Sequence, residues 1–137
     1  MQRIDVRTDR SFGTALHWAS LEGHVDVSLA LLEAGANIEA TNCWNRTPLH
    51  LAARFGHLEL VKLLVRHGAN KEARRDTNET PLHFAIEENH YAIAKYLNVG
   101  ADINALGGRG TPLKFAQGYG SDRLEIVELL VSRGAKS

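Results

Sequence analysis

Histidine is the residue type in this chain whose number and spacing first suggest chemistry. Imidazole is the commonest metal ligand in proteins and the side chain best suited to proton transfer near neutral pH. The sequence holds seven histidines. Six of them repeat at intervals of 33 residues, with only His67 outside the two series: His17, His50 and His83, and His24, His57 and His90. A metal site or an acid–base site therefore has to be weighed against a structural role.

The first histidine series lies inside a short motif that occurs four times. The clearest copy is Thr47-Pro48-Leu49-His50-Leu51-Ala52, and the others begin at Thr14, Thr80 and Thr111, which places the threonines 33, 33 and 31 residues apart. A fixed period in this range is the signature of a stacked repeat array. Threonine can accept a hydrogen bond from an unpaired backbone N–H at a helix start, and proline is tolerated at the first helical position. Each copy therefore predicts a helix, with its leucine and alanine on one face.

A second apolar segment follows each motif and predicts a second helix. In the first repeat we expect this helix to run from Val25 to about Ala34, with Val27, Ala30 and Leu31 on its buried side. Glycine after an apolar helical run supplies the left-handed residue that ends a helix at low cost. The later repeats follow the same pattern, with Leu60, Val61, Leu63 and Leu64 before Gly68, and Ile126, Val127, Leu129 and Leu130 before Gly134.

Repeats three and four depart from the pattern. The second helix of repeat three is one residue short, and so is the segment after it, residues 101–110, which contains three glycines. In repeat four, Lys114 replaces the histidine of the motif, and the junction between the helices, residues 117–122, holds two extra residues. We expect Asp122 to be the N-cap of the last helix. Terminal repeats are atypical because one face has no neighbouring repeat.

The four motifs resemble the Thr-Pro-Leu-His-x-Ala signature of ankyrin repeats, and their copies cover nearly the whole chain. The resemblance implies an all-α solenoid, an ankyrin-repeat array of stacked helix-turn-helix units with short β-hairpin fingers. We expect a single ankyrin-repeat domain over residues 1–137, with repeats at approximately 4–36, 37–69, 70–101 and 102–137. The finger tips would then lie at residues 42–46 and 75–79.

The repeat register disfavours a shared metal ion in either histidine series. Equivalent residues of successive layers lie about 10 Å apart for packed helices, whereas each ligand of a zinc ion lies about 2.0–2.1 Å from it. By resemblance to the ankyrin family, the first series bonds its own threonine and neighbouring backbone, and the second helps to close the turn between the two helices. We therefore expect no metal and no cofactor.

Motifs that would indicate an enzyme are missing. The sequence has no Gly-x-Ser-x-Gly elbow, no phosphate-binding Gly-rich loop before Lys-Ser/Thr, no Cys-x-x-Cys and no His-Glu-x-x-His. Residues 107–110, Gly-Gly-Arg-Gly, precede a helix and faintly resemble an anion-binding turn. They lack a preceding core strand and a following lysine, so a shortened finger is the better interpretation. The sequence predicts a protein that is not an enzyme.

Composition and charge restrict the partner and the compartment. The chain has 44% hydrophobic and 23% charged residues, with 16 basic and 16 acidic residues and a formal net charge of zero. No apolar run approaches the roughly 20 residues that span a bilayer, and residues 1–5 do not resemble a signal peptide. The single cysteine, Cys43, cannot form an intramolecular disulfide, which fits a reducing compartment. We expect a cytoplasmic or nuclear monomer without a membrane partner.

By resemblance, the finger tips and the exposed face of the first helices would bind another protein. Carried over repeat by repeat, the candidate partner-binding residues are Arg10, Ser11, Leu21, Glu22, Cys43, Trp44, Arg46, Arg54, Phe55, Asp76, Thr77, Glu79, Glu87, Glu88, Arg109 and Tyr119.

Trp44 is the most informative candidate, because tryptophan is a residue type that dominates interface hot spots and a finger tip has little core to fill. With Leu21 and Phe55 it could form an apolar centre flanked by Arg46 and Arg54. The alternative is that Trp44 lies flat over the next finger and only stabilises the stack. The three aromatic residues that share the repeat position of Leu51 are expected to pack in the core: Trp18, Phe84 and Phe115.

Two other functions stay open. The first is nucleic-acid or nucleotide binding, in which Trp44 stacks on a base beside a basic stretch containing Lys62, Arg66, His67, Lys71, Arg74 and Arg75. Interspersed acids and the zero net charge disfavour it. The second is a recruiting subunit of a larger enzyme or effector assembly.

Overall fold

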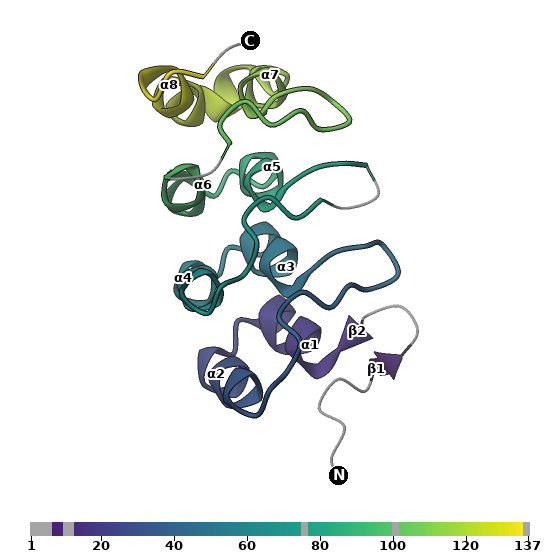
Figure 1. The fold of residues 1–137 in the computed structure, drawn as a ribbon. Coiled ribbons are helices and arrows are strands. Elements are labelled where there is room, and N and C mark those ends of the chain that lie inside the picture. Colours follow the sequence, from purple (N-terminus) through teal and green to yellow (C-terminus); the bar gives the residue numbers. More distant parts are fainter. Residues whose placement is uncertain (1–6, 10–12, 75–76, 100–101, 136–137) are drawn as a thin grey trace.

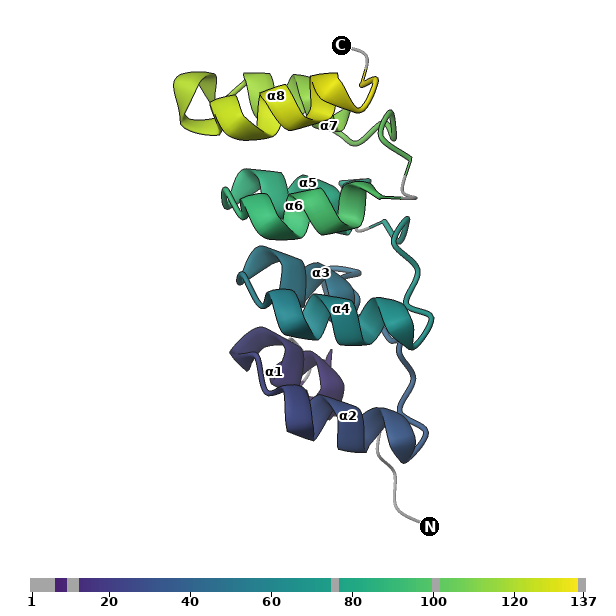
Figure 2. The same cartoon turned by 90° about the vertical axis from the view of Figure 1, so that its left-hand side faces the viewer.

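The computed structural model of the chain describes residues 7–9, 13–74, 77–99 and 102–135. Within these residues, eight α-helices form four stacked pairs, which confirms the predicted all-α array (Figure 1). The first helix of each pair lies in one layer: α1 (Ala15–Glu22), α3 (Pro48–Arg54), α5 (Pro81–Glu87) and α7 (Pro112–Gln117). The second helices form the other layer, which faces the viewer in Figure 2: α2 (Val25–Glu33), α4 (Leu58–Arg66), α6 (Tyr91–Asn98) and α8 (Leu124–Ser132).

Fingers project sideways between successive helix pairs (Figure 1). Regular strand structure in the described residues is confined to the antiparallel pair β1 (Arg7–Asp9) and β2 (Gly13–Thr14) and to a bridge between Gly107 and Gly110. The finger of residues 36–46 is instead closed by backbone hydrogen bonds from Asn42 N to Arg46 O and from Asn45 N to Asn42 O. The fingers are therefore hairpin-like loops.

The repeated motif starts each first helix in the way that the sequence predicted. Thr47 is the N-cap of α3, its hydroxyl accepts a hydrogen bond from His50 N, and Pro48 follows at the first helical position. The motif adds a second bond in the opposite direction, because the ring of His50 accepts the N–H of Thr47 at 3.1 Å. Two reciprocal bonds at a helix start form a capping box, in which histidine here takes the place of the usual glutamate.

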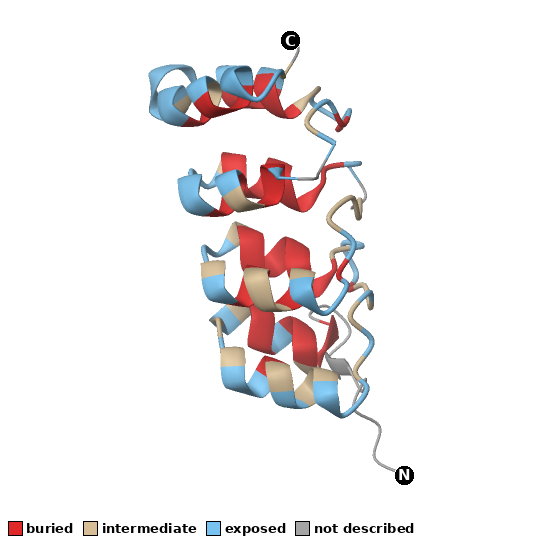
Figure 3. Cartoon of the chain, turned by 60° about the vertical axis from the view of Figure 1, so that its left-hand side comes forward, coloured by how far each residue is buried: buried red, intermediate tan, exposed pale blue. Residues whose placement is uncertain are grey.

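The core lies where the paired helices face each other, and Figure 3 shows the buried residues concentrated there. The predicted apolar stripes are confirmed in α4 and α8, where Leu60, Leu64, Ile126 and Leu130 are fully buried. The stripe predicted for α2 is wrong in part.

In α2, Val27 is 44% exposed and Ala30 is exposed, whereas Ser28 is fully buried. Leu60, Ile93 and Ile126 occupy the repeat position of Val27, and all three are buried. The difference arises because α2 belongs to the first helix pair and has no described helix pair on its outer side (Figure 1). The sequence pattern alone treats every repeat as an interior one.

The insertion in repeat four changes how the turn between its helices is held. Residues 120–123 form a 3-10 helix, and α8 starts at Leu124 with Arg123, not Asp122, as the N-cap residue. The prediction for Asp122 is therefore wrong. The Arg123 guanidinium donates to Ile86 O at 2.7 Å and to Glu87 O at 2.6 Å.

Histidine makes the equivalent bonds in earlier repeats. His57 Nε2 donates to Leu21 O, and His90 Nε2 donates to Arg54 O, both at 2.9 Å. Each of these bonds ties the turn of one helix pair to the first helix of the pair before it. This confirms the predicted role of the second histidine series for two of its members and shows that Arg123 takes it over in repeat four.

Asn98 should weaken the fold, so replacing it should stabilise the protein. Its amide nitrogen and oxygen are both buried without a hydrogen-bond partner. Val65 and Val131 occupy the same repeat position in α4 and α8. A buried unpaired polar group costs about 1–3 kcal/mol, so we expect Asn98→Val to raise the free energy of unfolding by about 1 kcal/mol, as measured by urea unfolding.

The reverse substitution, Val65→Asn, is the matched control and should lower the free energy of unfolding. A lower stability of the Asn98→Val protein would show that the amide has a partner in solution.

Candidate functional site

The first histidine series is built into the connections between repeats. His17, His50 and His83 are fully buried. In each ring Nδ1 accepts the backbone N–H of the motif threonine, so Nε2 carries the hydrogen. Nε2 then donates to a carbonyl at the end of the following finger, that of Arg46, Glu79 and Gly110 respectively. Both nitrogens of each ring thus stabilise the stack, as the resemblance implied.

A pocket lies on the side of the first helices and the finger tips, at the first two helix pairs. It has a volume of about 230 Å³, and Trp18, Leu21, Trp44 and Phe55 line it together with Arg46, Arg54 and other residues. Trp18, Trp44 and Phe55 are each nearly half exposed, at 46%, 44% and 47%. We call this site the aromatic pocket. It brings together the predicted apolar centre of Leu21, Trp44 and Phe55.

Trp18 is a residue of this pocket that the sequence did not predict. Phe84 and Phe115, at the same repeat position, are buried, as expected for core packing, but Trp18 is not. Its ring lies 5.1 Å from the ring of His24. As for Val27, the first helix pair has no described pair on its outer side, so the position of Trp18 in the first repeat was the available signal.

Backbone hydrogen bonds present Trp44 at the finger tip. Asn42 Oδ1 accepts the N–H groups of Trp44 and Arg46, each at 3.0 Å. Asn45 has a positive φ of 58°, a conformation that asparagine tolerates better than most residues. The turn is thus fixed from within, and the Trp44 ring stays 44% exposed.

Arg46 and Arg54 stack on the aromatic rings of the pocket. The Arg46 guanidinium carbon lies 5.5 Å from the centre of the Trp44 ring and 5.1 Å from that of Phe84. The Arg54 guanidinium carbon lies 5.7 Å from the centres of both the Phe55 and the Phe84 ring. Arg54 also approaches Glu88, with 3.8 Å between Nε and Oε1. Cation–π contacts of this kind favour a defined side-chain position.

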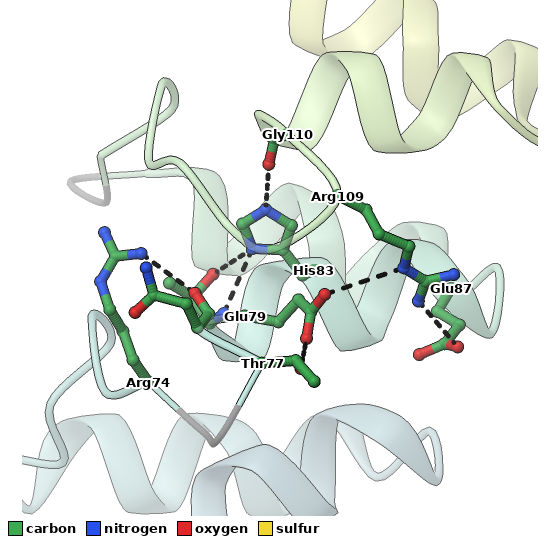
Figure 4. A network of polar contacts seen from close by, with 9 residues as sticks. Arg74, Thr77, Glu79, His83, Glu87, Arg109 and Gly110 are labelled. Atoms are coloured by element: carbon green, nitrogen blue, oxygen red, sulfur yellow. Dashed lines mark hydrogen bonds and ion pairs between the residues drawn. The ribbon is translucent and has the colours of Figure 1, made fainter.

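One layer further along, a polar network holds the finger of residues 102–110 (Figure 4). Glu79 is only 2% exposed, accepts a hydrogen bond from the Thr77 hydroxyl and lies 3.8 Å from Arg109 Nε. Arg109 also donates to Glu87 at 3.3 Å and lies 4.3 Å above the Phe115 ring. The prediction of Glu79 as an accessible finger-tip residue is wrong, because it is buried beneath this finger.

The network also affects protonation. Burial lowers the pKa of His83, and the nearby charges of Arg74 and Arg109 act in the same direction, while the bond to Gly110 O and the charge of Glu79 oppose them. Burial would also lower the pKa of Arg109, but its hydrogen bond to Glu87 and the surrounding charges raise it above the ordinary value. His83 is therefore neutral at pH 7, and Arg109 is charged.

The other candidate residues are distributed along the same flank. Glu22, Cys43, Thr77 and Glu88 are exposed, and Glu87 is partly buried. Tyr119 is partly buried, with its ring 5.7 Å from Phe115 and 4.5 Å from the Arg123 guanidinium, so it contributes to packing. Three candidates lie outside the described residues: Arg10, Ser11 and Asp76.

The basic stretch gives no support to the nucleic-acid alternative. Lys71 Nζ donates to Val99 O at 3.0 Å, and Arg74 donates to Leu106 O at 2.7 Å. Both cations thus tie their finger to the next repeat. Lys62 forms an ion pair with Glu59 at 3.5 Å, and Arg75 lies outside the described residues.

Stacked helix pairs, projecting fingers and an open, grooved flank define the chain as a helical repeat protein. The family model for ankyrin repeats matches residues 16–107 with three copies, so the chain belongs to the ankyrin-repeat family. The fourth helix pair, α7 and α8, lies beyond the matched residues. A search among curated proteins finds no significant match.

Members of this family are generally protein-interaction modules and are typically non-catalytic. In the part of the chain that the structure describes, no cluster of three potential metal ligands occurs and none of the helices is long and apolar enough to cross a membrane.

Proposed function

We propose that this chain is a non-enzymatic protein-interaction module that holds a partner protein at the aromatic pocket. The observation that carries the proposal is that three large aromatic rings, each nearly half exposed, gather around one pocket. Aromatic side chains bury 150–250 Å² each and dominate interface energetics. Their exposure therefore leaves apolar surface that a partner can cover.

The geometry favours a protein segment with an apolar anchor side chain. A pocket of about 230 Å³ is smaller than the usual 300–1,000 Å³ of a site that encloses a small molecule, but it can accept a large side chain. Arg54 and Glu88 beside it provide polar groups for the rim of such an interface. The wider flank, with Glu87 and Arg109 one layer on, could extend the contact.

Replacing Trp44 and Phe55 together by alanine tests this function. We expect at least about a tenfold loss of affinity for the partner, because both rings are hot-spot types at the pocket. Both are partly exposed, so the free energy of unfolding should change by less than about 1 kcal/mol. Affinity for a partner isolated with the intact chain can be measured by calorimetry.

A matched control replaces two apolar residues of similar exposure on the far side of the array. Leu124 and Val131 of α8 are 55% and 56% exposed, and Leu124→Ala with Val131→Ala should leave the affinity unchanged. If the folded Trp44→Ala, Phe55→Ala protein binds as tightly as the original chain, the partner does not use this pocket.

A further inference from the structure

We propose that a second groove, on the layer of second helices, binds an acidic segment of a protein that also carries apolar side chains. This groove is separate from the aromatic pocket and does not depend on the function proposed above. It runs along the outward face of α6, and residues of α4 and of the C-terminal end of α8 complete it (Figure 2). Its volume is about 440 Å³. We call it the second-helix groove.

The shortened third repeat opens this groove. α4 continues to Arg66, and the next residue, His67, has φ −88° and ψ 12°, close to helical geometry. α6 ends one residue earlier in the repeat, and Val99 leaves it in an extended conformation with φ −72° and ψ 114°. Val99 is consequently 58% exposed, and Tyr91 at the other end of α6 is 37% exposed. With Leu58 and Tyr96, these side chains make the floor of the groove apolar.

Cations surround the apolar floor. Lys62, Lys95 and Arg133 line the groove from three successive helix pairs, and no acidic residue of the described chain lines it. Lys62 is shared with Glu59 at 3.5 Å and lies 6.0 Å from the centre of the Tyr96 ring. Lys95 and Arg133 form no ion pair with any residue that the structure describes. Because the net charge of the chain is zero, this concentration of positive charge is local to the groove.

Neighbouring acids restrict which anion can approach. Tyr91 also lines a depression on the other side, where Glu125 and Glu128 of α8 contribute carboxylates. A flat anionic membrane or a long polynucleotide laid over this layer would meet these acids together with the lysines. A single narrow segment can contact the cations alone, with its carboxylates at the rim and its apolar side chains on the floor. Charge complementarity thus selects an acidic, partly apolar protein segment.

Selection from a random library of 12-residue peptides tests this proposal. The bait is the full chain carrying Trp44→Ala and Phe55→Ala, which removes the aromatic pocket from the selection. We expect the selected peptides to be rich in Asp and Glu next to apolar residues. Their affinity should fall about tenfold in Lys95→Glu, and it should be unchanged in the matched charge reversal Lys114→Glu on the first-helix layer. Both lysines are exposed, and urea unfolding checks that the variants are folded.

Three outcomes would overturn the proposal. The first is a selection that retains no peptide, or peptides without an excess of acids. The second is equal binding to the Lys95→Glu and Lys114→Glu proteins. The third is Lys95-dependent retention on vesicles containing phosphatidylserine, which would assign the cations to a membrane surface. Since the bait lacks the aromatic pocket, none of these outcomes bears on the binding lost with Trp44 and Phe55.

Discussion

His50→Ala is expected to lower the free energy of unfolding by about 3–5 kcal/mol. The His50 ring is fully buried, accepts the N–H of Thr47 at 3.1 Å and donates to Glu79 O at 3.2 Å. It also meets the Phe84 ring edge-on at 5.4 Å. Alanine would leave a buried N–H and a buried C=O unpaired, at about 1–3 kcal/mol each, and would add a cavity. His50 joins the second and third helix pairs, so the loss affects the centre of the stack.

Urea unfolding followed by circular dichroism at pH 7.5 measures this effect. The control is His24→Ala, since His24 is exposed and its ring makes no hydrogen bond with the described residues. We expect the control to lose less than about 1 kcal/mol, mainly its ring contact with Trp18. A loss below about 1 kcal/mol for His50→Ala would contradict the structural role assigned to the first histidine series.

Residues whose surroundings are supplied by the repeat itself could be predicted from the sequence. Thr47 and His50 cap α3 because the motif contains both members of the capping pair. Gly23 ends α1 with a φ of 77°, which glycine adopts without steric cost. Trp44 could be placed at an exposed finger tip because residues 42–46 lie between two helical patterns. In each case, the chemistry that decides the position lies within a few residues of it.

Residues whose surroundings depend on a particular neighbouring repeat could not be predicted. Trp18 and Val27 follow the motif but are exposed, because the first helix pair has no described pair outside it. Glu79 resembles a polar finger-tip residue, yet Arg109, 30 positions later in the chain, covers it. Arg123 replaces a histidine only because the insertion in residues 117–122 shifts the register. A pattern averaged over repeats contains no information about these pairwise differences.

Lowering the pH below about 6.5 is expected to destabilise the fold by up to about 1.4 kcal/mol per pH unit through His83 alone. Burial, the largest cause, lowers the pKa of His83 in the folded chain below its ordinary value of 6.5. The unfolded chain therefore binds the proton first as the pH falls. The stability that neutral His83 contributes is complete above pH 6.5 and is lost as the pH falls from 6.5 toward the lower pKa of the folded state. In the folded chain, a protonated Nδ1 would oppose the N–H of Thr80, which it now accepts at 3.2 Å.

A His83→Gln protein separates this titration from that of the other histidines. Glutamine cannot take up the proton, so its free energy of unfolding should fall less steeply with pH just below 6.5, by up to about 1.4 kcal/mol per unit. At pH 7.5 the variant should be less stable than the original chain, because it loses the bond from Nε2 to Gly110 O. Urea unfolding at half-unit steps from pH 7.5 to 5.0 measures both effects. Parallel curves for the two proteins would mean that His83 takes up its proton equally well in the folded and the unfolded chain, which its burial against Gly110 and Thr80 argues against.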